Sequence, residues 1–523
     1  MKIRLAALAA LACATPAQAD WLKAESEHFV VYADDSEKDV ARFTEILERY
    51  HAAMEQLTGR ESVAPSPSNR VTIYAVGSRR DVRDLAGGSK FLGGFYIPRA
   101  GASAAFVSDV RPSHGELERP MITLLHEYAH HFFIGSNRFA MPVWMNEGAA
   151  DFFASARFPK DGGIEIGRPA DHRALELRYA VDVPIEQLLS RKRSLPTGKN
   201  AKYDSFYGRS WALYHYLTFE PTRRGQLGQY VRMIAEGQTS LKAAQEVFGD
   251  LQQLEKELDK YIAKRTKFGF VFQPEALSIG PVSISRVSDG LAEMLPTRIR
   301  SKRGVDDAQA KEVVEDARRI AAKYPDDAHV LAALAEAEQD VGNHDEAVAA
   351  ADRAIAIDPT IKDAHMQKGY ALFDKAEKAD DREELLRRSM GAFSALNKLE
   401  NDHPIPLIFY YRIQVERGQR PNENAKHALE RALQLAPFDR GLAMNVGQMQ
   451  AREGKIALAR HTLAPAAASP HGDSLSNFAK LLLDRLAEVP EGTEWSPGAL
   501  ELGVIQEVSV DEDAPEDDEA EGE

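Results

Sequence analysis

The chain has 523 residues, of which 44% are hydrophobic and 28% charged, and its formal net charge is −15. This length is too great for one ordinary hydrophobic core, so we expect two or more domains. The composition is that of a globular protein, and the acidic balance argues against a nucleic-acid partner.

The N-terminus has the three parts of a secretion signal. Two basic residues precede the apolar stretch LAALAALACA (5–14), and AQA (17–19) is a small-x-small cleavage site. We therefore predict a signal peptide over residues 1–19, cleaved after Ala19, and a periplasmic or secreted mature protein. No later segment reaches about 18 consecutive apolar residues, so no membrane span is expected.

The sequence contains one cysteine, Cys13, which lies inside the predicted signal. Attachment as a lipoprotein through Cys13 is the less favoured alternative, because Ala10-Leu11-Ala12 before it is a poor lipobox. A mature chain without cysteine forms no disulfides and has no thiolate ligand. Any metal site in it must use histidine, aspartate or glutamate.

Residues 20–265 are predicted to form one α+β domain. HFVVYAD (28–34) and RVTIYAV (70–76) are rich in β-branched and aromatic residues and predict strands, whereas the apolar spacing of residues 37–58 predicts a helix between them. GGFYIP and ASAAFVSDV (102–110) predict a hairpin. Helical patterns dominate from there to the end of the domain, and a small mixed sheet followed by helices is the order of an α+β fold.

Residues 266–304 have a different character. The run FVFQPEALSIGPVSISRVSDG (270–290) is β-like and interrupted by proline and glycine, and the segment ends on the basic stretch RIRSKRG. This pattern predicts a short strand-containing connector.

From residue 305 the chain becomes alanine-rich and helical, with prolines at 325, 359, 404, 437 and 470. Three of the four spacings are 33 or 34 residues, which predicts tetratricopeptide repeats over residues 305–475. The 45-residue spacing indicates an insertion near residues 376–388. Such repeats stack into an all-α solenoid whose concave surface binds a protein partner. An unrelated alanine-rich helical domain is the alternative.

Two segments follow the repeats. Residues 476–506 are predicted to be a C-terminal extension. Residues 507–523 are acidic and almost without apolar side chains, so they cannot bury enough surface to offset their ordering entropy and are expected to be disordered. A solubilising role for this tail is favoured over a specific site for a basic partner.

LLHEYAHHFF (124–133) contains the pattern H-E-x-x-H at His126, Glu127 and His130. On a helix, two histidines four residues apart leave from one face and can bind the same metal ion. Glu127 is rotated by about 100° from His126, where it can reach a metal-bound water and accept its proton. The alternative is a buried amphipathic helix whose histidines serve packing only, and a third ligand decides between the two.

PVWMNEGAADFF (142–153) supplies that third ligand. A histidine six residues after His130 is excluded, because Ser136 stands there. Glu147 lies on a new helical segment, where it can complete a His₂Glu site with one position open for water. Asp151, one turn later, is placed to hydrogen-bond a ligand imidazole and fix its tautomer.

H-E-x-x-H followed by N-E-G-x-x-D resembles the gluzincin metallopeptidases, and the attached repeats resemble bacterial proteins with a "peptidase MA-like" domain. The resemblance covers roughly residues 25–265 for the peptidase and 305–470 for the repeats. It implies a Zn²⁺ cofactor. The ligands that it implies are His126, His130 and Glu147, with Glu127 as the general base.

The same resemblance implies a tyrosine that stabilises the oxyanion of the tetrahedral intermediate, about sixty residues after the glutamate ligand. Tyr207 lies sixty residues past Glu147 in a Tyr-Gly-Arg-Ser context and is the first choice. Tyr203 and His215 are the next candidates. The alternative for Tyr207 is a packing residue at the start of a helix.

Related aminopeptidases carry a G-x-M-E-N strand whose glutamate binds the free amine of the substrate. At the corresponding place this chain has GASAAFV (101–107), in which Ala104 and Ala105 provide no carboxylate. The resemblance therefore implies an endopeptidase rather than an aminopeptidase. We also expect that this strand can pair with an extended peptide by β-augmentation.

Other polar features near the motif are weaker. The basic segment 190–203 lies between Glu147 and Tyr207, and a solvated loop is favoured over one that overhangs the cleft. His131 and His172 are expected to be structural or surface residues.

The sequence thus predicts a secreted or periplasmic zinc peptidase that cleaves a peptide or protein substrate, with the repeats recruiting a protein partner or the substrate. The alternative is a repeat-based binding or assembly protein in which the peptidase-like domain is weakly active or purely structural.

Overall fold

The structure of the protein is a computed structural model. The described residues are 21–60, 63–87, 94–110, 117–136, 139–190, 203–264, 268–469 and 473–498. The predicted signal peptide with Cys13, nearly all of the basic segment 190–203, the end of the predicted extension and the acidic tail lie outside these ranges. Among the helices in them, none combines the length and apolar character needed to cross a membrane.

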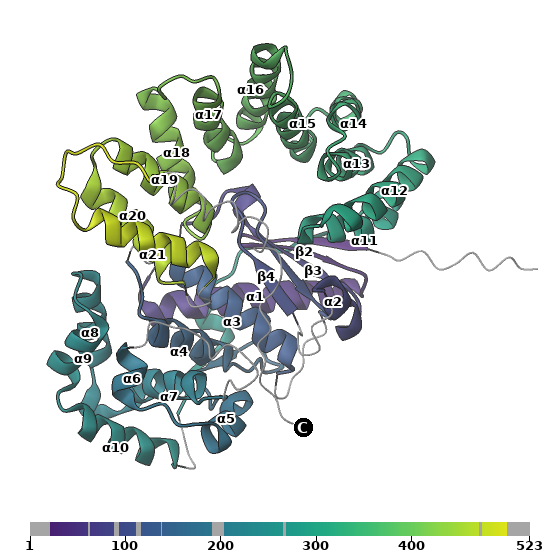
Figure 1. Cartoon of the computed structure of the whole chain (residues 1–523). Coiled ribbons are helices and arrows are strands. Elements are labelled where there is room, and N and C mark those ends of the chain that lie inside the picture. The colour runs from purple at the N-terminus through teal and green to yellow at the C-terminus, as the bar shows by residue number, and fades with distance from the viewer. Residues whose placement is uncertain are drawn as a thin grey trace, which may run out of the picture.

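A six-stranded mixed sheet with the strand order β4-β5-β3-β2-β1-β8 is the centre of the N-terminal body (Figure 1). β2, β3 and β5 run parallel, and β4, β1 and β8 join antiparallel at the two sides. These strands are β1 (Leu22–Glu25), β2 (Phe29–Ala33), β3 (Val71–Ala75), β4 (Gly94–Ile97), β5 (Ala104–Val107) and β8 (Ser283–Arg286). The two predicted strands and the predicted hairpin are confirmed.

The pairing of β5 corrects one expectation. β5 contains Ala104 and Ala105, and it is bonded to β4 on one side and to β3 on the other. Its backbone groups are therefore used within the sheet and cannot pair with a substrate. The terminal strand on this side is β4.

Side chains alternate between the two faces of the sheet, as the strand period requires. One face contributes to the main core with α1 (Glu37–Thr58), α3 (Arg119–Ser136) and α4 (Val143–Ala154). The other face carries the stacked rings of Tyr32, Tyr74 and Phe106 and is covered by α11 (Asp289–Arg303). The predicted helix at 37–58 is confirmed as α1, which Ser36 caps by accepting a hydrogen bond from the Asp39 N–H.

A further helical layer packs around α4, with α7 (Phe206–Phe219) as its main contact. The other elements of the body are α2 (Arg79–Leu85), α5 (Ala174–Tyr179), α6 (Ile185–Ser190), α8 (Gln226–Ala235), α9 (Ser240–Phe248), α10 (Leu251–Ile262) and the hairpin of β6 (Ile164–Ile166) and β7 (Phe270–Phe272).

The segment 266–304, expected to be a connector, belongs to the body instead. β7 pairs with β6, and β8 extends the main sheet beside β1. The basic stretch that closes this segment belongs to the helix α11, which continues through Pro296. Leu291, Leu295 and Ile299 recur at helical spacing and are buried against the sheet, and this burial outweighs the break that a proline favours.

From α12 onward, the helices form an arc over the body, from the teal helices beside the sheet to the yellow helices on the other side (Figure 1). The predicted solenoid of helical repeats is confirmed. The insertion lengthens α16 to 18 residues, and α21 packs on α20, so the solenoid continues past residue 475. Its helices are α12 (Asp307–Lys323), α13 (Ala328–Asp340), α14 (His344–Ile357), α15 (Lys362–Lys375), α16 (Arg382–Leu399), α17 (Pro404–Glu416), α18 (Glu423–Leu435), α19 (Arg440–Arg452), α20 (Ile456–Ala467) and α21 (Ser474–Leu486).

Gly369→Ala in α15 is expected to destabilise the solenoid, because the added Cβ would lie 2.5 Å from the ring of Phe393 in α16. We expect the free energy of unfolding to fall by about 1–3 kcal/mol. The matched control is Gly391→Ala in α16, where nothing lies within 4 Å of the added Cβ. This control should stabilise by about 0.5–1 kcal/mol through helix propensity. Thermal unfolding followed by circular dichroism measures both, and equal effects of the two changes would contradict the packing.

Candidate metal centre

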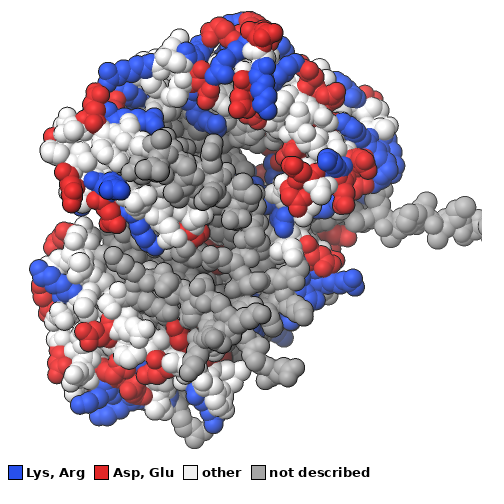
Figure 2. All heavy atoms as spheres, in the orientation of Figure 1, with Lys and Arg blue, Asp and Glu red and all other residues white. Residues whose placement is uncertain are grey.

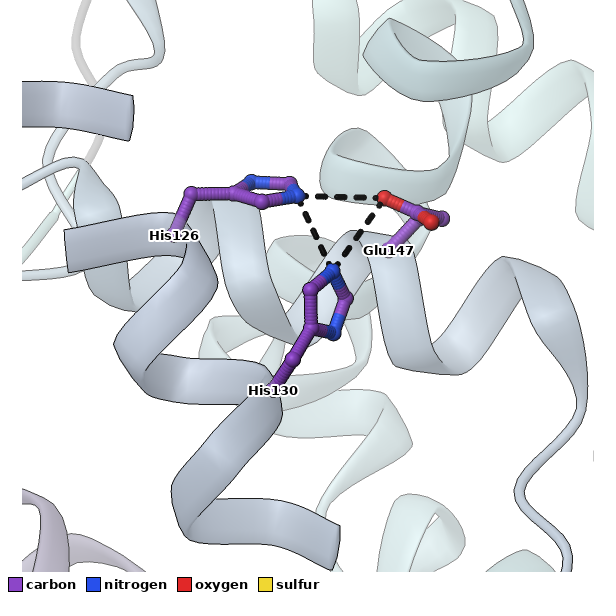
Figure 3. A group of neighbouring side chains, drawn as sticks. All are labelled: His126, His130 and Glu147. Carbon is purple, nitrogen blue, oxygen red and sulfur yellow. Dashed lines mark hydrogen bonds and ion pairs between the residues drawn. The ribbon is translucent and has the colours of Figure 1, made fainter. Parts of the chain in front are cut away.

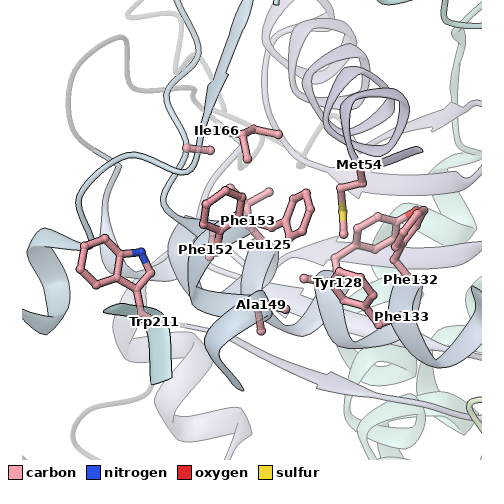
Figure 4. Packing of buried hydrophobic residues seen from close by; sticks show 14 of the residues in the cluster. Met54, Leu125, Tyr128, Phe132, Phe133, Ala149, Phe152, Phe153, Ile166 and Trp211 are labelled. Carbon is pink, nitrogen blue, oxygen red and sulfur yellow. The ribbon is translucent and has the colours of Figure 1, made fainter. Parts of the chain in front are cut away.

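α3 carries the H-E-x-x-H pattern on a helix that is fixed by its apolar side. Leu125, Tyr128, Phe132 and Phe133 are buried in the main core, close to Met54 of α1 and to α4 (Figure 4). Leu125, Tyr128 and Phe132 recur at i, i+3 and i+7 and therefore form one face of the helix, whereas Phe133 packs from the side nearer His126. The two motif histidines leave from a different face, whose direction is set by this packing.

α4 begins directly after Pro142 and brings the second half of the site. It is buried over nearly its whole length, including the polar residues Asn146, Glu147 and Asp151. Gly148 makes this possible, since a Cβ there would lie only 2.4 Å from the carbonyl oxygen of Ser210 in α7. Polar side chains of α4 are thus placed inside the protein, where each needs a partner.

The side chains of His126, His130 and Glu147 converge on one point between α3 and α4 (Figure 3). The two Nε2 atoms lie 3.0 Å apart, and Glu147 Oε2 lies 3.2 Å from His126 Nε2 and 3.7 Å from His130 Nε2. Ligand atoms bound at about 2.0 Å around a tetrahedral ion lie about 3.3 Å from one another. The three observed separations scatter around this value, so one ion fits between the three atoms.

Glu147 supplies a second test of the fit. Its side chain is completely buried, and neither carboxylate oxygen has a hydrogen-bond partner among the residues that the structure describes. Burial opposes its ionisation, but the two facing imidazoles lower the pKa of Glu147 well below its usual range. A buried carboxylate of this kind is costly unless a cation or protonated group neutralises it. A divalent metal at the convergence point would do so.

Hydrogen bonds on the outer side of each imidazole fix its orientation. His126 Nδ1 lies 3.0 Å from Asp151 Oδ1, and His130 Nδ1 lies 3.1 Å from Asn146 Oδ1. In this arrangement each Nδ1 donates its hydrogen outward, and each Nε2 faces Glu147 and offers its lone pair once the imidazole is neutral. That is the tautomer which metal binding through Nε2 requires.

The same contacts make the site sensitive to pH. Burial lowers the pKa of the His126 imidazole, but the hydrogen bond to Asp151 and the negative charges of Asp151 and Glu147 outweigh it and raise that pKa to about 10. A proton held here competes with a metal ion for Nε2, because a metal ligand must be the neutral imidazole. Metal affinity is therefore expected to fall as the pH decreases.

Asp151 is itself held by two residues from the segment that precedes α5. Arg173 donates from Nε to Asp151 Oδ2 at 2.8 Å, and His172 Nε2 lies 3.2 Å from Asp151 Oδ1. The guanidinium of Arg173 also lies over the ring of Tyr207, 4.5 Å from its centroid. A chain of contacts thus runs from His126 through Asp151 and Arg173 to Tyr207.

The remaining predicted residues lie at different distances from this cluster. Glu127 is half-buried on α3, next to His126. Tyr203 is 43% exposed, and its hydroxyl donates to Glu176 at 3.4 Å. His215 is fully buried in α7, with its ring nitrogens 2.7 Å from the Tyr261 hydroxyl and 2.9 Å from the Gly167 carbonyl. Both nitrogens of His215 are used in the core, which removes it as an oxyanion donor.

Sequence reasoning missed three residues that hold the cluster in place. The sequence motif includes Asn146 only as the neighbour of Glu147. Its spacing from Glu147 and Asp151 on one predicted helix could have marked it as a further polar residue of the site. His172, which was expected to be a structural or surface residue, and Arg173 contact Asp151. They come from a segment without periodicity, so the sequence contains no pattern that links them to Asp151.

Comparison with known proteins gives little information on function. A family model described as "Protein of unknown function (DUF1570)" matches residues 121–239, a span that contains every proposed metal ligand and Tyr207. No curated protein matches the chain in sequence. Among solved structures, the thermophilic TPR protein TTC0263 of Thermus thermophilus is similar at 15% identity and a TM-score of 0.29, covering 34% of this chain and 91% of its own.

Two structures of MamA are similar to the same degree. The MamA RS-1 ArsTM double mutant has 15% identity and a TM-score of 0.27, with 38% of this chain and 97% of its own covered. A second MamA structure has 15% identity and a TM-score of 0.25, with 35% and 92% covered. Similarities this low carry no argument about activity, so the functional argument depends on the geometry of the site.

Asp151→Asn is expected to weaken zinc binding about ten- to hundredfold, because the amide keeps the shape of the carboxylate but removes the charge that orients His126. Competition against a chelator of known affinity measures the effect. Asp171→Asn is the control, since Asp171 is exposed in the same segment as Arg173. Unchanged affinity in Asp151→Asn would show that the contact between His126 and Asp151 does not tune the site.

Proposed function

We propose that the protein is a zinc-dependent peptidase of the gluzincin type, in which His126, His130 and Glu147 bind Zn²⁺. The observation that carries this proposal is the buried Glu147 carboxylate, which faces two Nε2 atoms at ligand spacing and has no hydrogen-bond partner among the described residues. When bound, zinc supplies the Lewis acidity that makes a water molecule nucleophilic near neutral pH.

Glu127 is proposed as the general base. It follows His126 on the same helix, so its carboxylate points about 100° away from the ligand direction and stays outside the ligand set. From there it accepts the proton of the attacking water and then delivers it to the leaving amine. The fixed position of α3 keeps this carboxylate beside the reacting atoms.

The substrate is proposed to be an internal peptide bond of a peptide or protein. Ala104 and Ala105 lie within the sheet and offer no carboxylate for a free amine, which supports an endopeptidase. The strand available for an extended peptide is β4, at the end of the sheet and in contact with α3. The sequence of residues 1–19 supports a periplasmic or secreted location.

The solenoid is proposed to bring a protein partner or protein substrate to this site through its tetratricopeptide-like repeats. Figure 2 shows positive and negative side chains interspersed over the described residues of the visible face, without a large area of one sign. This pattern favours a protein partner over a polyanion. A binding or assembly protein whose metal site is only structural is the alternative, and the next experiment separates the two.

Glu127→Gln is expected to retain one zinc per chain and to lose peptide cleavage by at least about a hundredfold, because the amide cannot accept the proton of the attacking water. Metal content and cleavage of a broad peptide library are measured on the same preparations. Glu186→Gln is the control, because Glu186 is exposed on α6. Zinc binding without peptide cleavage in the wild type would contradict the peptidase proposal and favour the alternative, a binding or assembly protein with a structural metal site.

Tyr207→Phe tests the proposed oxyanion donor. We expect kcat to fall about a hundred- to thousandfold with the zinc content unchanged, because the ring and its contact with Arg173 remain while the hydroxyl donor is lost. Steady-state kinetics on a cleaved peptide measure this change. An unchanged kcat would assign Tyr207 to packing at the start of α7.

A further inference from the structure

A row of acidic residues lies near the start of the first helix in successive helix pairs of the solenoid. Each lies in or beside the turn that precedes the first helix of a pair, before α13, α15, α17 and α19, and they are 36 to 39 residues apart. The residues of this acidic row are Asp327, Asp363, Glu400 and Asp439. Spacing near the repeat length places them along one edge of the solenoid.

Every member of the acidic row accepts a hydrogen bond from the N-terminal body. Asp327 and Asp363 bind two residues at α11, the first to the hydroxyl of Ser288 and the second to the guanidinium of Arg298. Glu400 accepts from the Ser68 N–H at 3.0 Å and from its hydroxyl at 2.7 Å. Asp439 accepts from the Ala100 N–H at 2.9 Å.

A fifth acidic residue near the start of a helix, Asp473, forms its ion pair within the solenoid. It lies directly before α21, and its carboxylate pairs with Arg440. Among the described residues, the acidic side chains of this series that hydrogen-bond the body are therefore the four near the starts of α13, α15, α17 and α19, and Glu400 also pairs with Lys362 of the solenoid. This edge is therefore an interface within the chain rather than a general property of the repeat sequence.

The Asp439 contact holds the turn between β4 and β5, and the Glu400 contact holds Ser68, the neighbour of a residue that bonds to this turn. Gly101 lies in this turn with φ of 71°, and a Cβ there would lie 2.9 Å from His403 Cε1 and 3.3 Å from Ile405 Cγ1. The Gly101 N–H donates to Asn69 Oδ1 at 2.9 Å, and Asn69 Nδ2 donates to the Leu435 carbonyl at 3.1 Å. The turn is thus enclosed by the solenoid without space for a side chain.

The same part of the solenoid contacts the helix of the metal centre. The ring of Phe438 lies 4.5 Å from that of His131, the residue that follows the ligand His130. His131 Nδ1 lies 2.6 Å from the hydroxyl of Tyr96 in β4. Ile134, one turn after His130, packs on the hydrophobic core of the solenoid. α3 is therefore held between β4 and the turn that joins α18 to α19.

We propose that the solenoid is a clasp that the chain closes on its own metal-site domain, with Phe438 and Asp439 as positioning residues. By holding the β4–β5 turn and α3, the closed clasp sets the relative position of the zinc ligands and of strand β4. A partner that displaces the acidic row would loosen the site, so docking of the solenoid regulates it. The effect on metal binding rests on the proposed zinc function, whereas the docking itself does not.

Gly101→Ala in the full chain opens the clasp without changing a metal ligand, because the added methyl group collides with His403 and Ile405. We expect amide hydrogen exchange in β4, β5 and the second half of α3 to become about tenfold faster. Zinc affinity should fall about tenfold, and the visible absorption bands of the cobalt(II)-substituted protein should shift as the ligand geometry changes.

Gly418→Ala is the matched control. Gly418 has φ of 68° and nothing lies within 4 Å of an added Cβ, so the change has the same backbone strain without the collision. The double variant Gly101→Ala/His403→Ala removes the nearest colliding side chain and should restore slow exchange and the cobalt spectrum. His403→Ala alone is measured to correct for the weak cap of this residue on α17.

Equal rates of amide hydrogen exchange in Gly101→Ala and Gly418→Ala would contradict the proposal that the solenoid acts as a clasp. Faster exchange with unchanged zinc affinity and cobalt spectrum would overturn the positioning role and leave only docking. A wild-type protein that binds neither metal would refute the proposed function and the effect on the metal site together, while the exchange comparison would still decide whether the solenoid is docked.

Discussion

A completely buried carboxylate is the constraint on which the rest of the structure depends. Glu147 reaches its position because α4 packs tightly against α3 and α7, which Gly148 permits. A charge at this depth is stable only with compensation of comparable strength. The surrounding residues supply two imidazoles on one side and no hydrogen-bond donor of another kind among the described residues. The proposed zinc ion completes this arrangement.

The remaining parts of the body hold the side chains of the three proposed ligands in fixed relative positions. The apolar face of α3 fixes the rotation of the two histidines, and Asn146 and Asp151 fix the orientation of their rings. Asp151 is fixed in turn by Arg173, which also contacts Tyr207. The solenoid adds a contact from outside, through Phe438 and the β4–β5 turn. Each of these sets of contacts restricts the movement of the residues that lie closer to the three ligands.

Local patterns in the sequence were sufficient to predict several elements and the cluster of His126, His130 and Glu147. The period of residues 37–58 predicted α1, the proline spacing predicted the solenoid, and the spacing of His126, His130 and Glu147 predicted their convergence. Long-range contacts were not predictable, because β8 pairs with β1 across some 260 residues and Arg173 reaches Asp151 from a short 3-10 helix that no periodic pattern marks. The helix α11 was not predicted, because Pro296 interrupts its apolar periodicity. The helix forms nevertheless, because its apolar side chains are buried against the sheet.

The most direct test of the central claim is X-ray absorption at the zinc edge of the metal-loaded protein. The account predicts four-coordinate zinc with two imidazole nitrogens and a carboxylate oxygen at about 2.0 Å, the imidazoles being recognised by their outer-shell scattering. In Glu147→Ala one oxygen ligand should be lost or replaced by water while both imidazoles remain. A zinc environment without imidazole scattering, or one unchanged in Glu147→Ala and in His126→Ala, would contradict the assignment of the site.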